Sequence, residues 1–129
     1  MNNVLKYAGL MMIVVGLQAC NKDDDGPSGG KGGNATLRIT PKHHQPAKDS
    51  VMVYIKYNTL DKPSSYDDSA RTQVIGTDTV ATFTGLKKGN YYIYGYGWDP
   101  AIQQNIKGGI PYVITEEVTQ SLVLPVTED

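Results

Sequence analysis

Cysteine is almost missing from this sequence, and so is an excess of charge of either sign. The chain has 129 residues, one cysteine (Cys20) and a formal net charge of −1. A single cysteine excludes an internal disulfide, and a near-neutral chain lacks the basic surface of nucleic-acid-binding proteins. The apolar run 8–17 is too short to cross a bilayer as a helix. We therefore expect one folded domain that binds no nucleic acid.

The lone cysteine ends a segment with the layout of a signal peptide. Lys6 precedes the apolar run 8–17, and Leu-Gln-Ala-Cys follows at 17–20. This order of charge, apolar run and small residue is typical of signal peptides. Leu-Gln-Ala-Cys resembles the lipobox of bacterial lipoproteins, which implies cleavage before Cys20 and a covalent lipid on its sulfur. A diacylglyceryl group supplies two acyl chains, enough for stable anchoring. The alternative is an ordinary signal peptide that contains a cysteine.

The next segment is polar and rich in glycine. After a signal peptide at 1–19, the composition of 20–34 predicts a flexible tether that carries the lipid. Its aspartates at 23–25 resemble the acidic export signal of Bacteroidetes surface lipoproteins, which implies an outer-membrane protein displayed on the cell surface. In the alternative, the aspartates only keep the tether solvated and the domain lies on the periplasmic face.

Residues 35–129 are predicted to form an all-β domain. Short runs of β-branched and aromatic residues alternate with turn residues, and no window has a helical period. The predicted strands are 35–40, 51–57, 71–75, 79–84, 90–98, 111–115 and 120–126. This pattern predicts a seven-stranded β-sandwich, antiparallel or mixed. Pro125 predicts an edge position or a bulge in the last strand, since proline donates no ladder hydrogen bond.

The segment 81–97, ATFTGLKKGNYYIYGYG, carries a family resemblance. It resembles the signature of transthyretin-like sandwiches, namely carboxypeptidase regulatory-like and Cna B-type modules. The matching residues are Phe83, Gly85, Leu86, Gly89, Tyr91 and Ile93. The resemblance implies a prealbumin-type fold, with an immunoglobulin-like Greek key as the alternative. The strand 120–126 has no asparagine, so the isopeptide bond of Cna B-type modules is not expected.

Residues that could do chemistry are few. His43 and His44 are adjacent, so in an extended segment their side chains diverge and do not share a metal ion. Asp67-Asp68-Ser69 lacks the spacing of a calcium loop, and no serine lies in a nucleophile elbow. We expect no catalytic residue, no metal site and no cofactor besides the lipid on Cys20. A hydrolase that uses the polar loop 60–71 is the least favoured alternative.

The aromatic stretch 89–99, GNYYIYGYGWD, is the candidate binding site. The family register places Tyr91, Ile93 and Gly95 in the core, and a slip of one residue would reverse both faces. The opposite face then carries Tyr92, Tyr94, Tyr96 and Trp98. These aromatics are covered by packing, half-exposed, or a platform for a glycan or an envelope protein.

The sequence as a whole predicts a non-catalytic envelope lipoprotein that acts in binding or assembly. In the first form of this hypothesis, the aromatic face recognises glycan. In the second, the domain is a structural or protein-interaction subunit of a surface assembly, like those of adhesins or pili, and strand 120–126 pairs with a partner.

Overall fold

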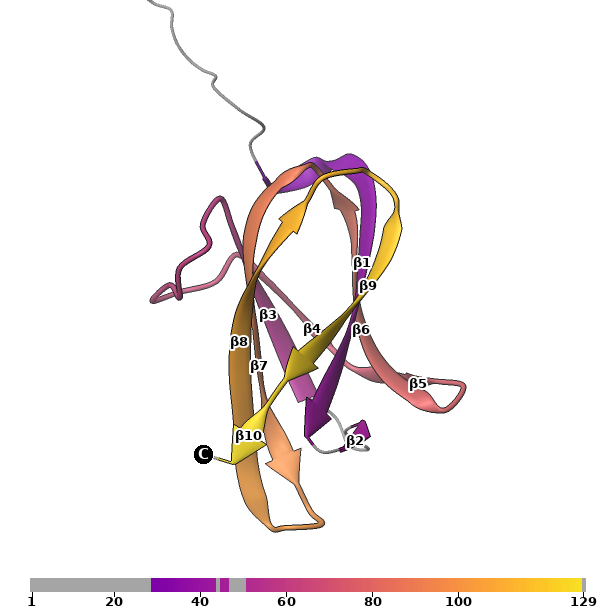
Figure 1. Ribbon diagram of the computed structural model, residues 1–129, viewed down its shortest axis with the longest axis vertical. Helices are drawn as coiled ribbons and strands as arrows, with labels where there is room; N and C mark the ends of the chain where they lie inside the picture. Colours follow the sequence, from indigo (N-terminus) through magenta and orange to yellow (C-terminus); the bar gives the residue numbers. More distant parts are fainter. Residues whose placement is uncertain (1–28, 44, 47–50, 129) are drawn as a thin grey trace, which may run out of the picture.

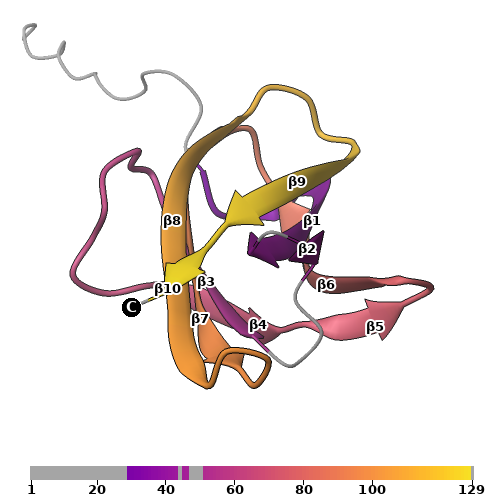
Figure 2. The same ribbon diagram turned by 60° about the horizontal axis from the view of Figure 1, so that its bottom comes forward.

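The computed structural model describes residues 29–43, 45–46 and 51–128. All regular elements in these residues are β-strands, arranged in two five-stranded sheets that pack face to face (Figures 1 and 2). The predicted all-β sandwich is therefore confirmed. No helix in the described part of the chain is long and apolar enough to cross a membrane.

The first sheet is mixed. Its strand order is β2 (Gln45–Pro46), β1 (Lys31–His43), β6 (Asp78–Leu86) and β5 (Gln73–Ile75), and β9 (Thr119–Pro125) runs parallel to β1. Among the described strands β9 pairs only with β1, so the edge position predicted from Pro125 is confirmed.

The second sheet is antiparallel throughout. Its order is β10 (Thr127–Glu128), β8 (Gln104–Ile114), β7 (Gly89–Asp99), β3 (Val51–Tyr57) and β4 (Asp68–Arg71). The strand β7 lies at its centre, between β8 and β3. Residues 91–97 of the aromatic stretch are therefore paired along both edges, and its two ends pair with β8.

The core lies between the sheets and follows the alternation of the sequence. Every second residue is buried along most of β1 and β3 and in the first half of β7, which matches the period of two that a strand imposes on its side chains. The buried apolar residues of the first sheet include Ala35, Leu37, Ile39, Ala81, Phe83, Leu86 and Leu124. Those of the second include Val51, Val53, Ile55, Tyr91, Ile93, Ile106 and Ile114.

The chain changes sheets inside two of the predicted strands. The run 71–75 divides at the buried residue Thr72 into β4 of the second sheet and β5 of the first. The last run divides at Val126, where the chain leaves β9 and continues as β10 in the other sheet. The division at Thr72 and the two-residue strands β2 and β10 give ten strands in the described residues where seven were predicted.

The strands β1 and β8 begin earliest relative to the predicted ranges, and in each a glycine permits a close backbone contact. The strand β1 begins at Lys31, inside the predicted tether. Gly33 makes this possible because it has no β-carbon, which would collide with the Leu86 carbonyl oxygen. The strand β8 begins at Gln104, seven residues before the predicted 111. A β-carbon at Gly108 would lie 2.1 Å from the Pro125 carbonyl oxygen, so glycine here permits close passage of two backbones.

Candidate functional site

The register of β7 is the one that the family resemblance predicts. Tyr91 and Ile93 are 0% exposed, and Gly95 is buried beside them. A β-carbon at Gly95 would lie 2.8 Å from the Leu124 Cδ2 atom, so a larger residue would collide with the first sheet. The alternative register, which buries Tyr92, is wrong because the core has no room opposite Gly95.

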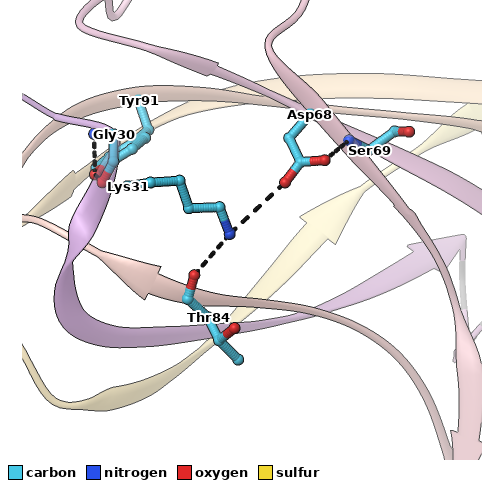
Figure 3. A network of polar contacts seen from close by, with 6 residues as sticks. All are labelled: Gly30, Lys31, Asp68, Ser69, Thr84 and Tyr91. Atoms are coloured by element: carbon cyan, nitrogen blue, oxygen red, sulfur yellow. Dashed lines mark hydrogen bonds and ion pairs between the residues drawn. The ribbon is translucent and has the colours of Figure 1, made fainter.

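Tyr91 fastens the start of the domain. Its hydroxyl accepts a hydrogen bond from the Gly30 amide (2.8 Å) and donates one to the Lys87 carbonyl oxygen (2.7 Å). Burial raises the pKa of this hydroxyl above its ordinary value. Figure 3 shows the adjoining contacts, in which Lys31 Nζ donates to the Thr84 carbonyl oxygen (2.8 Å) and lies 3.8 Å from Asp68 Oδ2. The residues that enter the fold are thus tied to both sheets.

The outward-facing aromatics of β7 divide into two environments. Tyr92 and Tyr94 are half-buried, whereas Tyr96 is 40% exposed and Trp98 is 49% exposed. Tyr92 lies over Gly109 of the neighbouring strand, where a β-carbon would come within 2.6 Å of its hydroxyl oxygen. The face is therefore packed near the start of β7 and open near its end.

The covered part of the face is an aromatic cluster that the sequence analysis did not identify. The Tyr66 ring stacks on Tyr94 with centroids 5.7 Å apart, and Tyr54 lies 5.5 Å from Tyr66. Lys62 Nζ lies 5.1 Å from the centroid of Tyr94. Tyr54 could have been found from its outward position on β3, directly opposite Tyr94. Tyr66 and Lys62 could not, because they lie in the β3–β4 loop, which has no strand period.

The β3–β4 loop is fixed against the sheet at Asp67. The Asp67 amide donates to the Ile55 carbonyl oxygen (2.9 Å), and its carboxylate accepts from the Tyr57 amide (2.8 Å) and Lys56 Nζ (3.4 Å). The Tyr66 hydroxyl is buried without a hydrogen-bond partner among the described residues, and burial raises its pKa. The loop thus covers Tyr94 and leaves the far end of β7 open.

The open end of β7 lies beside His43, which contacts two carboxylates. His43, at the end of β1, is 8% exposed. Its Nδ1 lies 3.5 Å from Asp99 Oδ2 and its Nε2 lies 3.2 Å from Glu128 Oε1. These contacts join the ends of β1, β7 and β10 directly after Trp98, and so hold in place the strand end that carries the exposed aromatics.

The structure does not bring Ser64 and Ser65 of the polar loop 60–71 together with His43, as a hydrolase with a serine nucleophile and a histidine base would require. Ser64 and Ser65 lie in the loop that follows Tyr57, and Tyr57 pairs with Tyr91 near the start of β7. His43 instead contacts Asp99 at the other end of β7. The part of the chain that the structure describes holds no group of three or more histidine, cysteine, aspartate or glutamate residues suited to a metal ion. Cys20 and His44 lie outside the described residues.

We compared the chain with protein-family models, with curated protein sequences and with solved structures, and none of the three comparisons gave a match.

Proposed function

We propose that this chain is a non-catalytic lipoprotein of the bacterial cell envelope, anchored in the outer membrane by a lipid on Cys20, whose domain binds glycan through the open end of β7. The observation that carries the proposal is the exposure of Tyr96 and Trp98, side by side on one sheet face. Aromatic rings at such positions offer a large apolar area at low cost in conformational entropy. The C–H face of a sugar ring stacks on such a surface.

The position of these residues along β7 supports the same proposal. The tether would enter the fold at Gly30, which the Tyr91 hydroxyl holds. Trp98 lies seven residues further along an extended strand, which places it about 24 Å from Tyr91. A ligand bound at Tyr96 and Trp98 would therefore meet the end of the domain opposite to the one where β1 begins (Figure 1).

The packed half of the face would supply rigidity. Tyr94 is clamped between Tyr54, Tyr66 and Lys62, and His43 holds the strand end beyond Trp98. A binding surface held in one conformation loses less entropy when a ligand binds.

Binding of the full chain to a glycan array tests the proposal. Tyr96→Ala and Trp98→Ala are each expected to weaken binding about tenfold, because each removes part of the stacking surface. Val74→Ala, which truncates a 71% exposed residue on the other sheet, is the matched control and should bind normally. Absence of binding across a broad array, or equal loss in the control, would contradict the proposal.

A structural or protein-interaction role is the second candidate, and the edges of the first sheet favour it. The strand β5 pairs only with β6 among the described strands, and Val74 and Ile75 on it are 71% and 46% exposed. Open edges with apolar side chains can accept a strand from a partner. The strand β9, the edge proposed from the sequence, is a poorer acceptor because Pro125 interrupts it. If this role holds, the chain forms concentration-dependent assemblies, and Val74→Lys abolishes them.

The anchor and the display on the cell surface have their own tests. Cys20→Ala should move the protein from the membrane fraction to the soluble fraction of cells, because the acylated sulfur is lost. Protease added to whole cells should remove the domain. Unchanged membrane association of Cys20→Ala would contradict the lipid anchor, and protection from protease until lysis would place the domain in the periplasm.

A further inference from the structure

A groove crosses the outer face of the first sheet, opposite the face that carries Tyr96 and Trp98. Its volume is about 370 Å³. Its lining residues come from β1, β6 and β9, and they are Arg38, Thr40, Lys42, Asp78, Val80, Ser121, Leu122 and Val123. The groove is separate from the aromatic face and was not identified from the sequence.

The groove opens where two strands separate. Pairing between β1 and β6 ends at Ile39 and Ala81, and residues 78–80 of β6 pair with β5 instead. The strand β1 continues to His43 beside β9, while the β5–β6 hairpin projects away from it (Figure 2). Val80 lies between the diverging strands and is only 6% exposed although it lines the groove, so it forms part of the floor.

The charges of the groove are not neutralised within the described structure. Arg38 and Lys42 lie on the same face of β1, about 13 Å apart along the strand. The side chain of neither residue forms an ion pair or a hydrogen bond with the described residues. Asp78 is the one carboxylate in the lining, and it forms no ion pair with either cation. Among the described residues, the groove therefore presents two cationic side chains without an ion pair and one carboxylate acceptor.

Hydroxyl and apolar groups lie between these charges. Ser121 is the neighbour of Arg38 on β9, and Val123 is the neighbour of Thr40. Val123 is 53% exposed, so an apolar surface remains available beside the hydroxyl of Thr40. A ligand that fits this lining carries a negative charge, several hydroxyl groups and an apolar patch.

We propose that the groove binds an acidic saccharide. Its carboxylate or sulfate groups would accept hydrogen bonds from Arg38 at one end of the groove and from Lys42 at the other, as charged acceptors do from such donors. Its hydroxyls would meet Thr40, Ser121 and the Asp78 carboxylate, and its C–H face would lie on Val80 and Val123. The volume of the groove lies within the range of small-molecule sites. A membrane surface fits less well, because the groove is recessed and binding to anionic lipid draws only about 1 kcal/mol from each basic residue.

Calorimetric titration of the full chain tests this site. The probes are an oligogalacturonate, which carries carboxylates, a heparin-derived oligosaccharide, which carries sulfates, and a neutral maltooligosaccharide. We expect saturable binding of at least one acidic probe, none of the neutral one, and affinity that falls as salt rises. Arg38→Gln and Lys42→Gln should each weaken the binding about tenfold, the value of one hydrogen bond to a charged group.

The controls separate the groove from general charge attraction and from the aromatic face. Arg71→Gln removes an exposed cation from β4 of the other sheet and should leave binding unchanged. An equal loss in this variant would overturn the proposal, and so would loss of binding in Tyr96→Ala, which would place the acidic sugar on the aromatic face. Absence of binding by both acidic probes would also overturn it. If vesicles of phosphatidylcholine and phosphatidylglycerol bind in their place and Arg38→Gln prevents this, the groove contacts lipid and the saccharide proposal is wrong.

Discussion

At the scale of single residues, Tyr91 is the side chain that holds the start of the domain. Its ring is fully buried in the core. Its hydroxyl accepts a hydrogen bond from the Gly30 amide and donates one to the Lys87 carbonyl oxygen, at the point where the start of β1 crosses the β6–β7 turn. Gly30 also packs against the Tyr57 ring. A β-carbon added at Gly30 would lie 3.3 Å from the Tyr57 Cδ2 atom. Buried polar atoms of this kind find their hydrogen-bond partners where distant segments of the chain cross. A local sequence pattern does not predict such crossings.

Tyr91→Phe should lower the free energy of unfolding by about 1–3 kcal/mol, because the buried Gly30 amide and Lys87 carbonyl lose their partner. Urea denaturation measures the change. Tyr96→Phe, at a position that is 40% exposed, is the matched control and should change stability by less than about 0.5 kcal/mol. Equal stability of the two variants would show that the Tyr91 hydroxyl does not hold the start of the domain.

Stability should also fall in alkaline solution. Burial raises the pKa of Tyr57, Tyr66 and Tyr91 above 10.0, the value of a tyrosine in the unfolded chain. The folded state therefore keeps these protons longer, and the stability they contribute is complete below pH 10 and lost as pH rises through the folded pKa values. Urea denaturation above and below pH 10 checks this. In Tyr91→Phe the unfolding free energy should fall less steeply with rising pH, because one of the three buried hydroxyls is absent. A stability that is constant across this range would contradict the burial of these hydroxyls.

At the scale of elements, the sequence predicted strands well where apolar and polar side chains alternate. It predicted them poorly where strand formation depends on close contacts between backbones. The predicted runs 51–57 and 79–84 lie in β3 and β6. The first half of β8 was not predicted because it contains Gly108 and Gly109, and glycine is common in loops. Their role here is to make room for the Pro125 backbone and the Tyr92 ring. The division of 71–75 between two sheets was missed because the residues on both sides of Thr72 favour strands.

Thr72 is the element-scale test. Its hydroxyl accepts a hydrogen bond from the Val51 amide (2.9 Å) at the point where the chain passes between sheets. Thr72→Val keeps the shape of the side chain but leaves that buried amide without a partner, which should cost about 1–3 kcal/mol of unfolding free energy. Thr82→Val, on the exposed face of β6, should be nearly neutral. Thermal and urea denaturation compare the two, and equal effects would contradict the role of the Thr72 hydroxyl.

At the scale of the whole molecule, the two outer faces of the sandwich differ in chemistry. One carries aromatic rings that are packed at one end and open at the other, and the opposite one carries the groove with Arg38 and Lys42. The sequence predicted the aromatic face because four aromatics recur with a period of two. Which half is exposed depends on the β3–β4 loop, whose path has no signal in the sequence. The groove depends on the separation of β1 from β6, which the sequence does not predict either.

The central claim is that Tyr96 and Trp98 form the glycan surface, and Trp98 reports on it directly as the single tryptophan of the chain. Titration of the full chain with the best ligand from the glycan array should shift Trp98 emission to shorter wavelength in a saturable way, because a stacked sugar displaces water. In Tyr96→Ala the midpoint of this titration should rise about tenfold. A glycan that binds without changing Trp98 emission, and with the same affinity in Tyr96→Ala, would contradict the account.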